Sequence, residues 1–546
     1  MFIRTQSNGE RTYLLLVENE RVDGRIKQKV IARLGRLDVL RANGDLDRLL
    51  KSLGRFSEKF SVLGAHRNGE AVTTHTRIVG PALIFERLWN ELGVDEVINK
   101  LSSARRFNFP IERAVFLTVL HRLFQSGSDR AAEKWKAEYA IAGCNELELH
   151  QLYRTMSWLG EPLTEDDKVH PAAIRTCKDL IEEALFARRR DLFTELGIVF
   201  FDTTSLYFEG AGGERLGQNG HSKDHRPDLK QMVVGVVIDN AGCPLMSQMW
   251  PGNTTDVTTL VPIVDRLRTD FKVGEICIVA DRGMISQGTI EQIEARGWRY
   301  ILGVRMRRCK EANQEVLSRA GRYEEVYPKS KDPKAPSPLK VKEVWVEDRR
   351  YVVCLNEDQA TKDRYDREAI LASLSKALKQ GDKQLIGNRG YRKYLRSGGE
   401  HFQIDQDKIA AEARYDGKWV LTTNTDLTAR ELVLKYKQLW QVEAIFRTMK
   451  SQLATRPIFH KRDDTIRGHV FCTFLALLLR YELEVRLQQR NWGLEWDDII
   501  RDLNRLQEIA LALEDKHYVL RTEVKGTTGK VFQACGVALP PTLRSR

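Results

Sequence analysis

The chain has 546 residues, and 87 Lys and Arg against 75 Asp and Glu give it a formal charge of +12 at pH 7. This length predicts about three or four domains. A content of 42% hydrophobic and 30% charged residues excludes a disordered chain. The positive charge makes nucleic acids the first partners to consider, although many basic proteins bind none.

Cysteine spacing and hydropathy exclude several further classes of protein. The eight cysteines never lie within four residues of one another, so we expect neither a CxxC zinc or redox motif nor a disulfide framework. The N-terminus lacks the apolar core of a signal peptide. The most apolar run, 471–479, is too short to span a bilayer and predicts a buried helix segment. These features predict a cytoplasmic protein with no membrane role.

Residues 1–55 are predicted to form a small β-rich module. Asp23-Gly24 is a strong hairpin-turn signal between two stretches of strand-forming residues. The hairpin is rich in cations, namely Arg21, Arg25, Lys27, Lys29 and Arg33. They fit an edge strand protected by charge and a DNA-end-binding surface equally well.

Residues 78–190 are predicted to be helical. Ile111, Val115 and Val119 follow helical spacing, and Gly127 supplies a break between helices. The pattern favours a helical bundle, which is a second candidate region for DNA binding. It does not indicate any catalytic residue there.

Residues 197–305 follow the order strand, strand, strand, helix, strand, helix, strand. The first strand ends at Asp202 and the fourth ends at Asp281. Asn240-Ala241-Gly242 predicts a tight turn between the second and third strands. Thr255 or Asp256 is expected to cap the first helix of this region.

Asp202 and Asp281 each follow a run of largely apolar residues. A carboxylate at the end of a buried strand lies in a fixed, partly dry site, which suits a hard divalent cation. Aspartates also end strands as ordinary turn formers, and either residue alone fits that explanation. The two together, on strands that this order makes neighbours, favour a metal site.

A helix predicted at about 427–453 adds a third acid. One face, about 60° wide, presents an acid, an aromatic hydroxyl and two cations, which are Glu443, Tyr436, Arg447 and Lys450. An apolar stripe about a right angle away is expected to pack on a core, and it consists of Val442, Phe446, Met449 and Leu453. A surface i, i+4 pair would explain Glu443 and Arg447 alone, but not Tyr436 and Lys450 on the same face.

The segments FFDTTSLYF, VADRGM and YKQLWQVEAIFRTMK resemble the three catalytic segments of bacterial insertion-sequence DDE transposases. The spacing of Tyr436, Glu443 and Lys450 is similar to the branch with a Tyr, Arg, Glu, Lys signature, with Leu439 where that signature has Arg. Arg447 could supply the missing phosphate contact. GHSKDHRPDLKQ and RPIFHKRDDTIRGHVF also resemble this branch, so that the resemblance covers about the whole chain.

The resemblance implies a multidomain α/β protein with a ribonuclease H-like mixed-sheet core. The core is expected at 197–305 plus 427–485, with a β-rich insertion domain at 306–426. The remaining residues, 486–546, are expected to form a C-terminal helical region, a candidate dimerisation element.

The function implied is that of a DNA transposase, which cuts phosphodiester bonds at element ends and transfers 3′ ends to target DNA. Asp202, Asp281 and Glu443 are expected to be catalytic and to hold two Mg²⁺ or Mn²⁺ ions. The expected contacts with the DNA backbone are Tyr436, Arg447, Lys450, Lys223, Arg226, Lys230 and Arg282. The expected partners are terminal inverted repeats, target DNA and a second copy of the chain on paired ends, in a bacterial nucleoid. The segment GTTGK at 526–530 lacks the first Gly of a phosphate loop, so no nucleotide cofactor is expected.

Two other functions share part of this pattern. A metal nuclease with the same core would use all three acids but would hydrolyse DNA without joining it. A DNA-binding relic that has lost transposition would not need the acids, and their presence argues against it.

Overall fold

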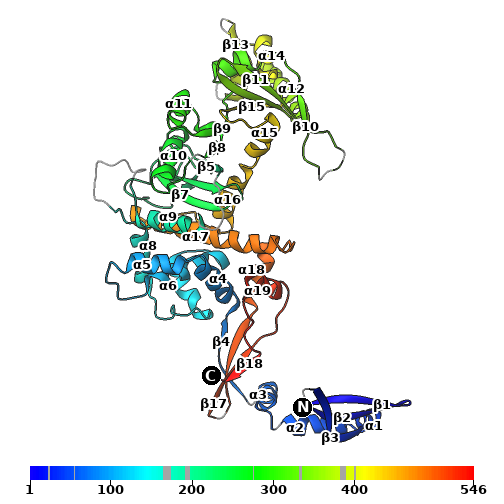
Figure 1. The fold of residues 1–546 in the computed structure, drawn as a ribbon. Helices are drawn as coiled ribbons and strands as arrows, with labels where there is room; N and C mark the ends of the chain where they lie inside the picture. The colour runs from blue at the N-terminus through cyan, green and yellow to red at the C-terminus, as the bar shows by residue number, and fades with distance from the viewer. Residues whose placement is uncertain are drawn as a thin grey trace. The chain divides into compact units, whose positions relative to one another are not determined.

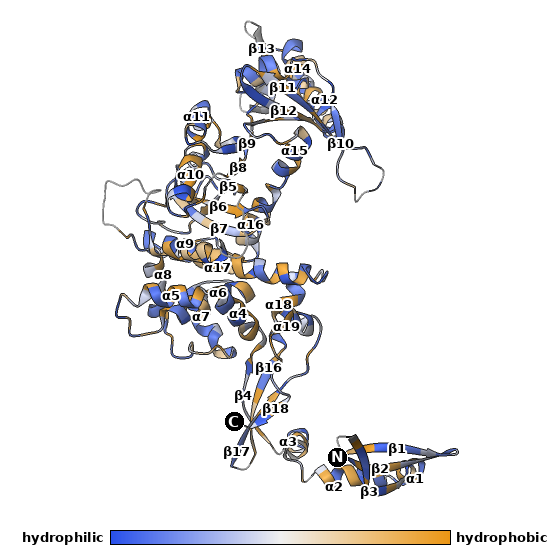
Figure 2. Ribbon diagram, viewed as in Figure 1, coloured by the Kyte–Doolittle hydropathy of each residue, from blue (hydrophilic) through white to orange (hydrophobic). Residues whose placement is uncertain are grey.

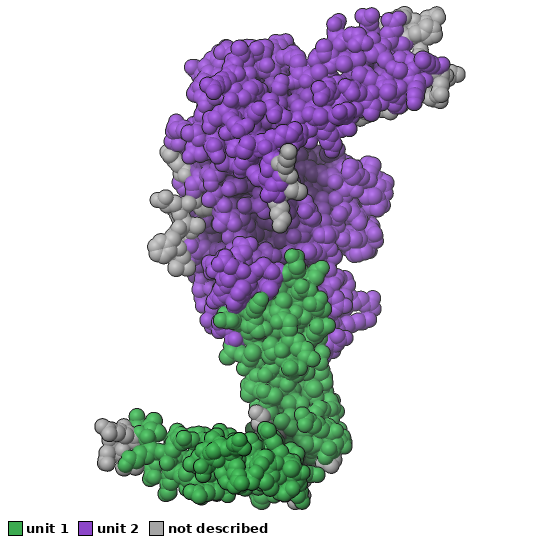
Figure 3. All heavy atoms as spheres, turned by 90° about the vertical axis from the view of Figure 1, so that its right-hand side faces the viewer, with its two compact units in different colours: residues 1–80, 495–533, 538–546 green, residues 81–494, 534–537 purple. Residues whose placement is uncertain are grey.

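The computed structural model describes residues 1–22, 25–54, 56–69, 71–163, 174–190, 197–274, 276–330, 332, 335–380, 389–398, 401–513 and 515–545. The chain divides into two compact units, coloured separately in Figure 3. Unit 1 comprises residues 1–80, 495–533 and 538–546, and unit 2 comprises residues 81–494 and 534–537.

The N-terminal part of unit 1 is the predicted β-rich module. Its sheet has the order β1-β2-β3, from β1 (Phe2–Asn8), β2 (Arg11–Val22) and β3 (Arg25–Arg36). The strands β2 and β3 pair antiparallel, as the hairpin prediction requires, whereas the turn residues Asp23 and Gly24 lie outside the described residues. Three helices follow, namely α1 (Leu37–Ala42), α2 (Asp45–Gly54) and α3 (Glu58–Arg67).

The rest of unit 1 corrects the prediction of a helical C-terminal region. A four-stranded antiparallel sheet has the order β18-β17-β16-β4. Its strands are β4 (Val72–Ile78), β16 (Gln507–Leu513), β17 (Lys516–Arg521) and β18 (Leu543–Ser545), with helices α18 (Trp496–Asn504) and α19 (Thr528–Cys535) beside them in sequence. The prediction failed because β16 pairs with β4, a strand from the other end of the chain.

The N-terminal part of unit 2 is helical, as predicted. Its helices are α4 (Gly80–Glu91), α5 (Val94–Ser102), α6 (Ile111–Phe124), α7 (Asp129–Trp135), the short η1 (Lys136–Glu138), α8 (Leu149–Leu159) and α9 (Cys177–Arg190). Helices α6 and α8 pack on α17 (Asp463–Gln488) (Figure 1). The contact with α8 is close, because a Cβ added at Gly468 would lie 2.1 Å from the Met156 carbonyl oxygen.

Helix α17 contains the most apolar run of the sequence. It is buried without interruption from Thr465 to Leu479, which confirms the prediction of a buried helix segment. Among the described residues, no helix is long and apolar enough to span a membrane.

The catalytic-core region of unit 2 has the predicted order of strands and helices. The elements are β5 (Ile198–Tyr207), β6 (Gln231–Asp239), β7 (Pro244–Pro251), α10 (Leu260–Thr269), β8 (Cys277–Ala280), α11 (Gln287–Ala295) and β9 (Arg299–Gly303). In the sheet they lie in the order β9-β8-β5-β6-β7, with β5 parallel to β8, β8 parallel to β9, and β6 antiparallel to β5 and β7. This is the ribonuclease H-like topology that the resemblance implied.

The sheet is buried because its central strands are continuous apolar runs. Residues Gln231–Ile238 of β6 are all buried, and apolar residues colour this strand orange in Figure 2. Phe201, Trp250, Ile278 and Tyr300 belong to one hydrophobic cluster that joins β5, β7, β8 and β9 to α10 and α11. This cluster fixes the strand ends that carry the acids.

The predicted insertion, 306–426, contributes to the same sheet. Strand β15 (Lys418–Thr423) pairs with β9, and β12 (Arg349–Leu355), β11 (Leu339–Val346) and β10 (Glu324–Tyr327) extend the sheet to nine strands. A separate hairpin is formed by β13 (Leu395–Gly398) and β14 (His401–Ile404). The helices here are α12 (Glu357–Gln380), α13 (Arg389–Arg392) and α14 (Gln406–Ala413).

The single helix predicted at about 427–453 is two helices. Helix α15 (Ala429–Lys437) ends before a turn at Gln438 and Leu439, and α16 (Trp440–Ser451) follows. Leu439 is 8% exposed, and its N–H donates to the carbonyl of Tyr436, three residues earlier, as in a tight turn. The predicted apolar stripe is confirmed in α16, where Val442, Phe446 and Met449 are buried.

Candidate active site

Asp202 and Asp281 lie side by side at the same edge of the sheet. Strands β5 and β8 are parallel, with Phe201 opposite Ala280. Asp281 directly follows the end of β8, whereas Asp202 lies inside β5, which continues to Tyr207. The prediction that the first strand ends at Asp202 is therefore wrong. Asp202 Oδ1 accepts the N–H of Thr203 at 2.7 Å. Asp281 Oδ2 accepts the N–H of Gly283 at 3.4 Å. The sequence prediction that these acids are neighbours is therefore confirmed.

The electrostatic surroundings of Asp202 disfavour its charge. Burial is the main cause that raises the pKa of this carboxyl from 3.8 to about 6. Lys223 and the Thr203 N–H lower the pKa, and the negative charges of Asp281 and Asp256 make smaller contributions that raise it.

We expect Asp202→Asn to stabilise the protein in metal-free buffer, and more at pH 8 than at pH 4.5. The folded-state pKa of about 6 exceeds the unfolded value of 3.8, so the folded state binds the proton more tightly. Wild-type stability is therefore lost as pH rises from about 4 to about 6, by roughly 3 kcal/mol in total, and stays low above that range. Melting temperatures in EDTA measure the difference. A wild-type protein more stable than the variant at pH 8 would contradict this explanation.

Asp256 is a further acid at this edge, and its role differs from the predicted helix cap. It begins a short 3-10 turn, Asp256–Thr258, in which no side chain caps the N-terminus. Instead its Oδ1 accepts the Thr203 hydroxyl at 2.8 Å, and its Oδ2 lies 3.3 Å from Lys223 Nζ. Asp256 and Asp281 both lie close to Gly283. A Cβ added at this glycine would be 3.4 Å from Asp256 Oδ2 and 3.8 Å from Asp281 Oδ2.

Tyr436 contacts an acid directly. Its hydroxyl donates to Asp281 Oδ1 at 3.0 Å, and burial, followed by the charge of Asp281, raises the pKa of this hydroxyl. Tyr436 belongs to α15 and Glu443 to α16, so the prediction that one continuous helix presents both on one face is wrong. The sequence could not show the turn between them, because no Gly or Pro marks it.

Glu443 lies on the exposed side of α16, a helix that contacts β5 and β6. Its carboxylate makes no hydrogen bond or ion pair with any described residue, so the simple pair with Arg447 is absent. Among the described residues, no group of three or more His, Cys, Asp or Glu side chains is arranged to hold a metal ion. The structure brings Asp202 and Asp281 together, and it does not bring Glu443 into one cluster with them.

Lys450 forms an ion pair that sequence analysis missed. Its Nζ lies 2.8 Å from Asp224 Oδ1, and Arg456 Nη1 lies 2.8 Å from the same oxygen. The Asp224 side chain is 5% exposed. Burial lowers the pKa of Lys450, and Asp224 partly offsets this effect. The pair ties the loop after β5 to α16.

The other predicted DNA contacts have different surroundings. Lys223 Nζ donates to the carbonyl and hydroxyl oxygens of Thr203 at 2.8 and 2.9 Å, and therefore lies within the acidic site. Arg226 pairs with Asp228 at 2.8 Å. The remaining residues are exposed, and they are Lys230, Arg282 and Arg447.

Two cavities flank the acidic edge, and Gly283 and Arg305 line both. One, of about 380 Å³, includes Asp256 and Lys223 in its lining, and the other, of about 440 Å³, includes Asp281. Cations on the segment after β9 gather at the second cavity, namely Arg305, Arg307 and Arg308. Sequence analysis missed this group, although three arginines within five residues of a strand end were a usable signal.

The donor atoms at this edge suit a divalent cation of the Mg²⁺ type. Such ions prefer carboxylate oxygens and keep several water ligands. Asp202 and Asp281 supply carboxylates from neighbouring parallel strands at the point where β8 ends, and the pKa of Asp202 is raised mainly because this carboxyl is buried. The residues present therefore fit such an ion.

Comparison with known proteins places the chain in a family. The model of the transposase DDE domain matches residues 194–479, and the model of the IS1634 family transposase N-terminal domain matches residues 3–66. Only the second of these models names the IS1634 family, and no comparison supports the branch with the Tyr, Arg, Glu, Lys signature. No curated protein matches the chain.

Two solved structures show distant likeness. One is a piggyBac transposase synaptic complex with hairpin DNA, which is 10% identical to this chain in sequence. The match covers 78% of this chain and 79% of the piggyBac chain, with a TM-score of 0.37. The other is a Mos1 transposase paired-end complex with the left transposon end, which is 13% identical in sequence. The match covers 36% of this chain and 60% of the Mos1 chain, with a TM-score of 0.15. The N-terminal match agrees with the DDE-domain match in naming a transposase. Because the DDE-domain match spans more than half of the chain, the protein belongs to the DDE transposases.

Proposed function

We propose that this transposase cuts phosphodiester bonds at the ends of its insertion sequence and transfers the 3′ ends to target DNA. The observation that carries the proposal is the placement of Asp202, inside β5, beside Asp281, which follows the end of the parallel strand β8, within a DDE transposase domain. The partners would be the terminal inverted repeats, target DNA and a second copy of the chain.

Asp202, Asp281 and Glu443 are the residues that would hold two Mg²⁺ or Mn²⁺ ions. When bound, such a pair supplies activation of the attacking oxygen and stabilisation of the leaving oxygen in an in-line displacement. Glu443 is exposed on α16, and its side chain would turn toward the strand ends when DNA is present.

The neighbouring side chains would position these groups. Tyr436 orients Asp281 through its hydrogen bond, and Lys223 lowers the pKa of Asp202, which favours the charged carboxylate. The exposed cations Arg282, Arg308 and Arg447 would contact DNA phosphates.

A strand-transfer assay tests the proposal. Purified protein, a labelled duplex that carries the element's own terminal repeat and a supercoiled plasmid are incubated with Mg²⁺ or Mn²⁺. We expect labelled 3′ ends joined to plasmid, and no product in EDTA. Metal-dependent cutting without joining would instead identify a nuclease, and binding without cutting would identify a DNA-binding relic.

A further inference from the structure

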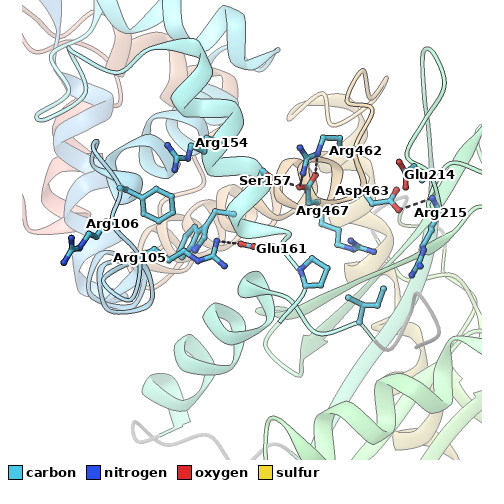
Figure 4. A pocket seen from close by; sticks show the side chains of 15 residues that line it. Arg105, Arg106, Arg154, Ser157, Glu161, Glu214, Arg215, Arg462, Asp463 and Arg467 are labelled. Carbon is cyan, nitrogen blue, oxygen red and sulfur yellow. Dashed lines mark hydrogen bonds and ion pairs between the residues drawn. The ribbon is translucent and has the colours of Figure 1, made fainter. Parts of the chain in front are cut away.

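A basic cavity of about 1140 Å³ lies within unit 2, away from the acidic edge. Its walls come from the loop after α5, from α8, from the loop after β5 and from the start of α17 (Figure 4). Six arginines line it, namely Arg105, Arg106, Arg154, Arg215, Arg462 and Arg467. The helical region and the core thus contribute cations to one cavity.

Most of the acidic side chains that line this cavity form hydrogen bonds or ion pairs with other residues of its walls. Asp463 accepts the backbone N–H groups of Arg215 and Leu216 at 3.0 and 3.3 Å. Asp464 Oδ2 accepts the Ser157 hydroxyl at 2.5 Å and Arg462 Nη2 at 2.6 Å. Glu161 pairs with Arg105. These carboxylates hold the walls together, and the charges of Asp463 and Asp464 also favour the charged form of Arg467. Glu214 is the remaining acid of the lining, so the arginines of the cavity outnumber its acids.

Arg467 is the buried arginine on which the case for a bound anion depends. It is 5% exposed, and it makes no hydrogen bond or ion pair with any of the residues that the structure describes. In Figure 4 its guanidinium points into the cavity. Burial lowers the pKa of this group. Its guanidinium lines the cavity and has five N–H donors in a planar fork, so an acceptor-rich anion in the cavity would match it.

The size and the rim of the cavity indicate which anion fits. The volume greatly exceeds that of a single phosphate, which favours a phosphate carried on a longer molecule. Arg154 lies over the Phe107 ring at 5.4 Å and is exposed, so a second cation stands at the rim. Planar guanidinium groups match phosphate oxygens well.

We propose that this cavity binds a backbone phosphate of DNA at a place separate from the acidic edge, with Arg467 as the buried ligand and Arg154 at the rim. The choice of DNA rests on the proposed function, whereas the anion site rests on the cavity alone. Such a contact would hold DNA on the core while its end is processed.

The salt dependence of DNA binding tests this proposal in EDTA, where no cutting occurs. Anisotropy of a labelled duplex of arbitrary sequence gives Kd over a range of salt concentrations. For Arg467→Gln we expect the slope of log K against log salt to fall by about 0.9, the value for one lost phosphate contact. The Kd should rise by about ten-fold. Arg154→Gln, at an exposed position that does not endanger folding, should lower the slope similarly.

Two controls make the result decisive. Arg268→Gln removes an exposed arginine from α10, outside this cavity, and should leave the slope unchanged. Arg467→Lys keeps the charge and should retain the slope while it weakens binding. Slopes equal to wild type in both Arg467→Gln and Arg154→Gln would overturn the proposal.

A competition arm separates DNA from a free anion. If inorganic pyrophosphate binds wild type but not Arg467→Gln, while the DNA slope is unchanged, the cavity holds a free anion and the DNA proposal is overturned. Because these measurements need no metal, they stand even if the acids prove not to be catalytic.

Discussion

Asp202→Asn is expected to abolish cutting of the element ends, with a loss of roughly a thousand-fold or more, as for other essential catalytic groups. Asp281→Asn should have the same effect, because each removes one of two adjacent carboxylates that would bind the same cations. Binding of the end should persist or tighten slightly, since a negative charge near the phosphates is removed. Cleavage of a labelled end in Mg²⁺ measures cutting, and the anisotropy of the same labelled end in EDTA measures binding.

A matched substitution isolates this effect from a general loss of charge. Asp265 lies on α10 of the same core and pairs with Arg296 on the surface, where its side chain is 47% exposed. Asp265→Asn should cut at the wild-type rate. Near-normal cutting by Asp202→Asn or Asp281→Asn would remove that residue from the catalytic group.

Asp224→Asn should destabilise the protein by about 3 kcal/mol, the usual cost of removing one partner of a buried ion pair. The carboxylate is 5% exposed, and it holds Lys450 and Arg456, whose side chains are 13% and 27% exposed. Its loss leaves two half-buried cations facing each other. Thermal unfolding should show a lower melting temperature, and end cleavage should fall because α16 carries both Lys450 and Glu443.

The same loop offers the control for this prediction. Asp228 pairs with Arg226, and their side chains are 57% and 47% exposed, so Asp228→Asn should change stability by less than about 1 kcal/mol. Equal melting temperatures for the two variants would show that the buried pair does not stabilise the loop.

The strand-end acids could be predicted from the sequence because their signal is local. Apolar runs that end at Asp202 and Asp281, together with the strand and helix order, were enough to place them side by side. The structure agrees that the two acids are neighbours. It differs at the end of the first strand, because β5 continues past Asp202 to Tyr207 and pairs there with β6, a contact with a distant segment that the local pattern does not show.

Other features depend on contacts between distant segments and could not be predicted. Asp256 resembled a helix cap, but its carboxylate reaches Thr203 and Lys223 across the site. The C-terminal strands need β4 as a partner. Arg467 lies in a polar segment at the start of α17, and only the folded cavity shows that its guanidinium makes no hydrogen bond or ion pair with the described residues.

The break between α15 and α16 has a consequence for the site. Tyr436 is aimed at Asp281 by α15, whereas Glu443 is placed by α16 and remains exposed. A sequence pattern that assumes one straight helix cannot separate these two directions. We therefore expect DNA or metal to bring Glu443 to Asp202 and Asp281.

Anomalous scattering from Mn²⁺, in crystals of the protein with its own terminal-repeat DNA, tests that convergence most directly. We expect two ions about 4 Å apart, both in contact with Asp202 or Asp281, and a Glu443 carboxylate oxygen about 2 Å from one of them. Ions bound elsewhere, or a Glu443 side chain that still faces solvent with the DNA end in place, would contradict the proposed catalytic group.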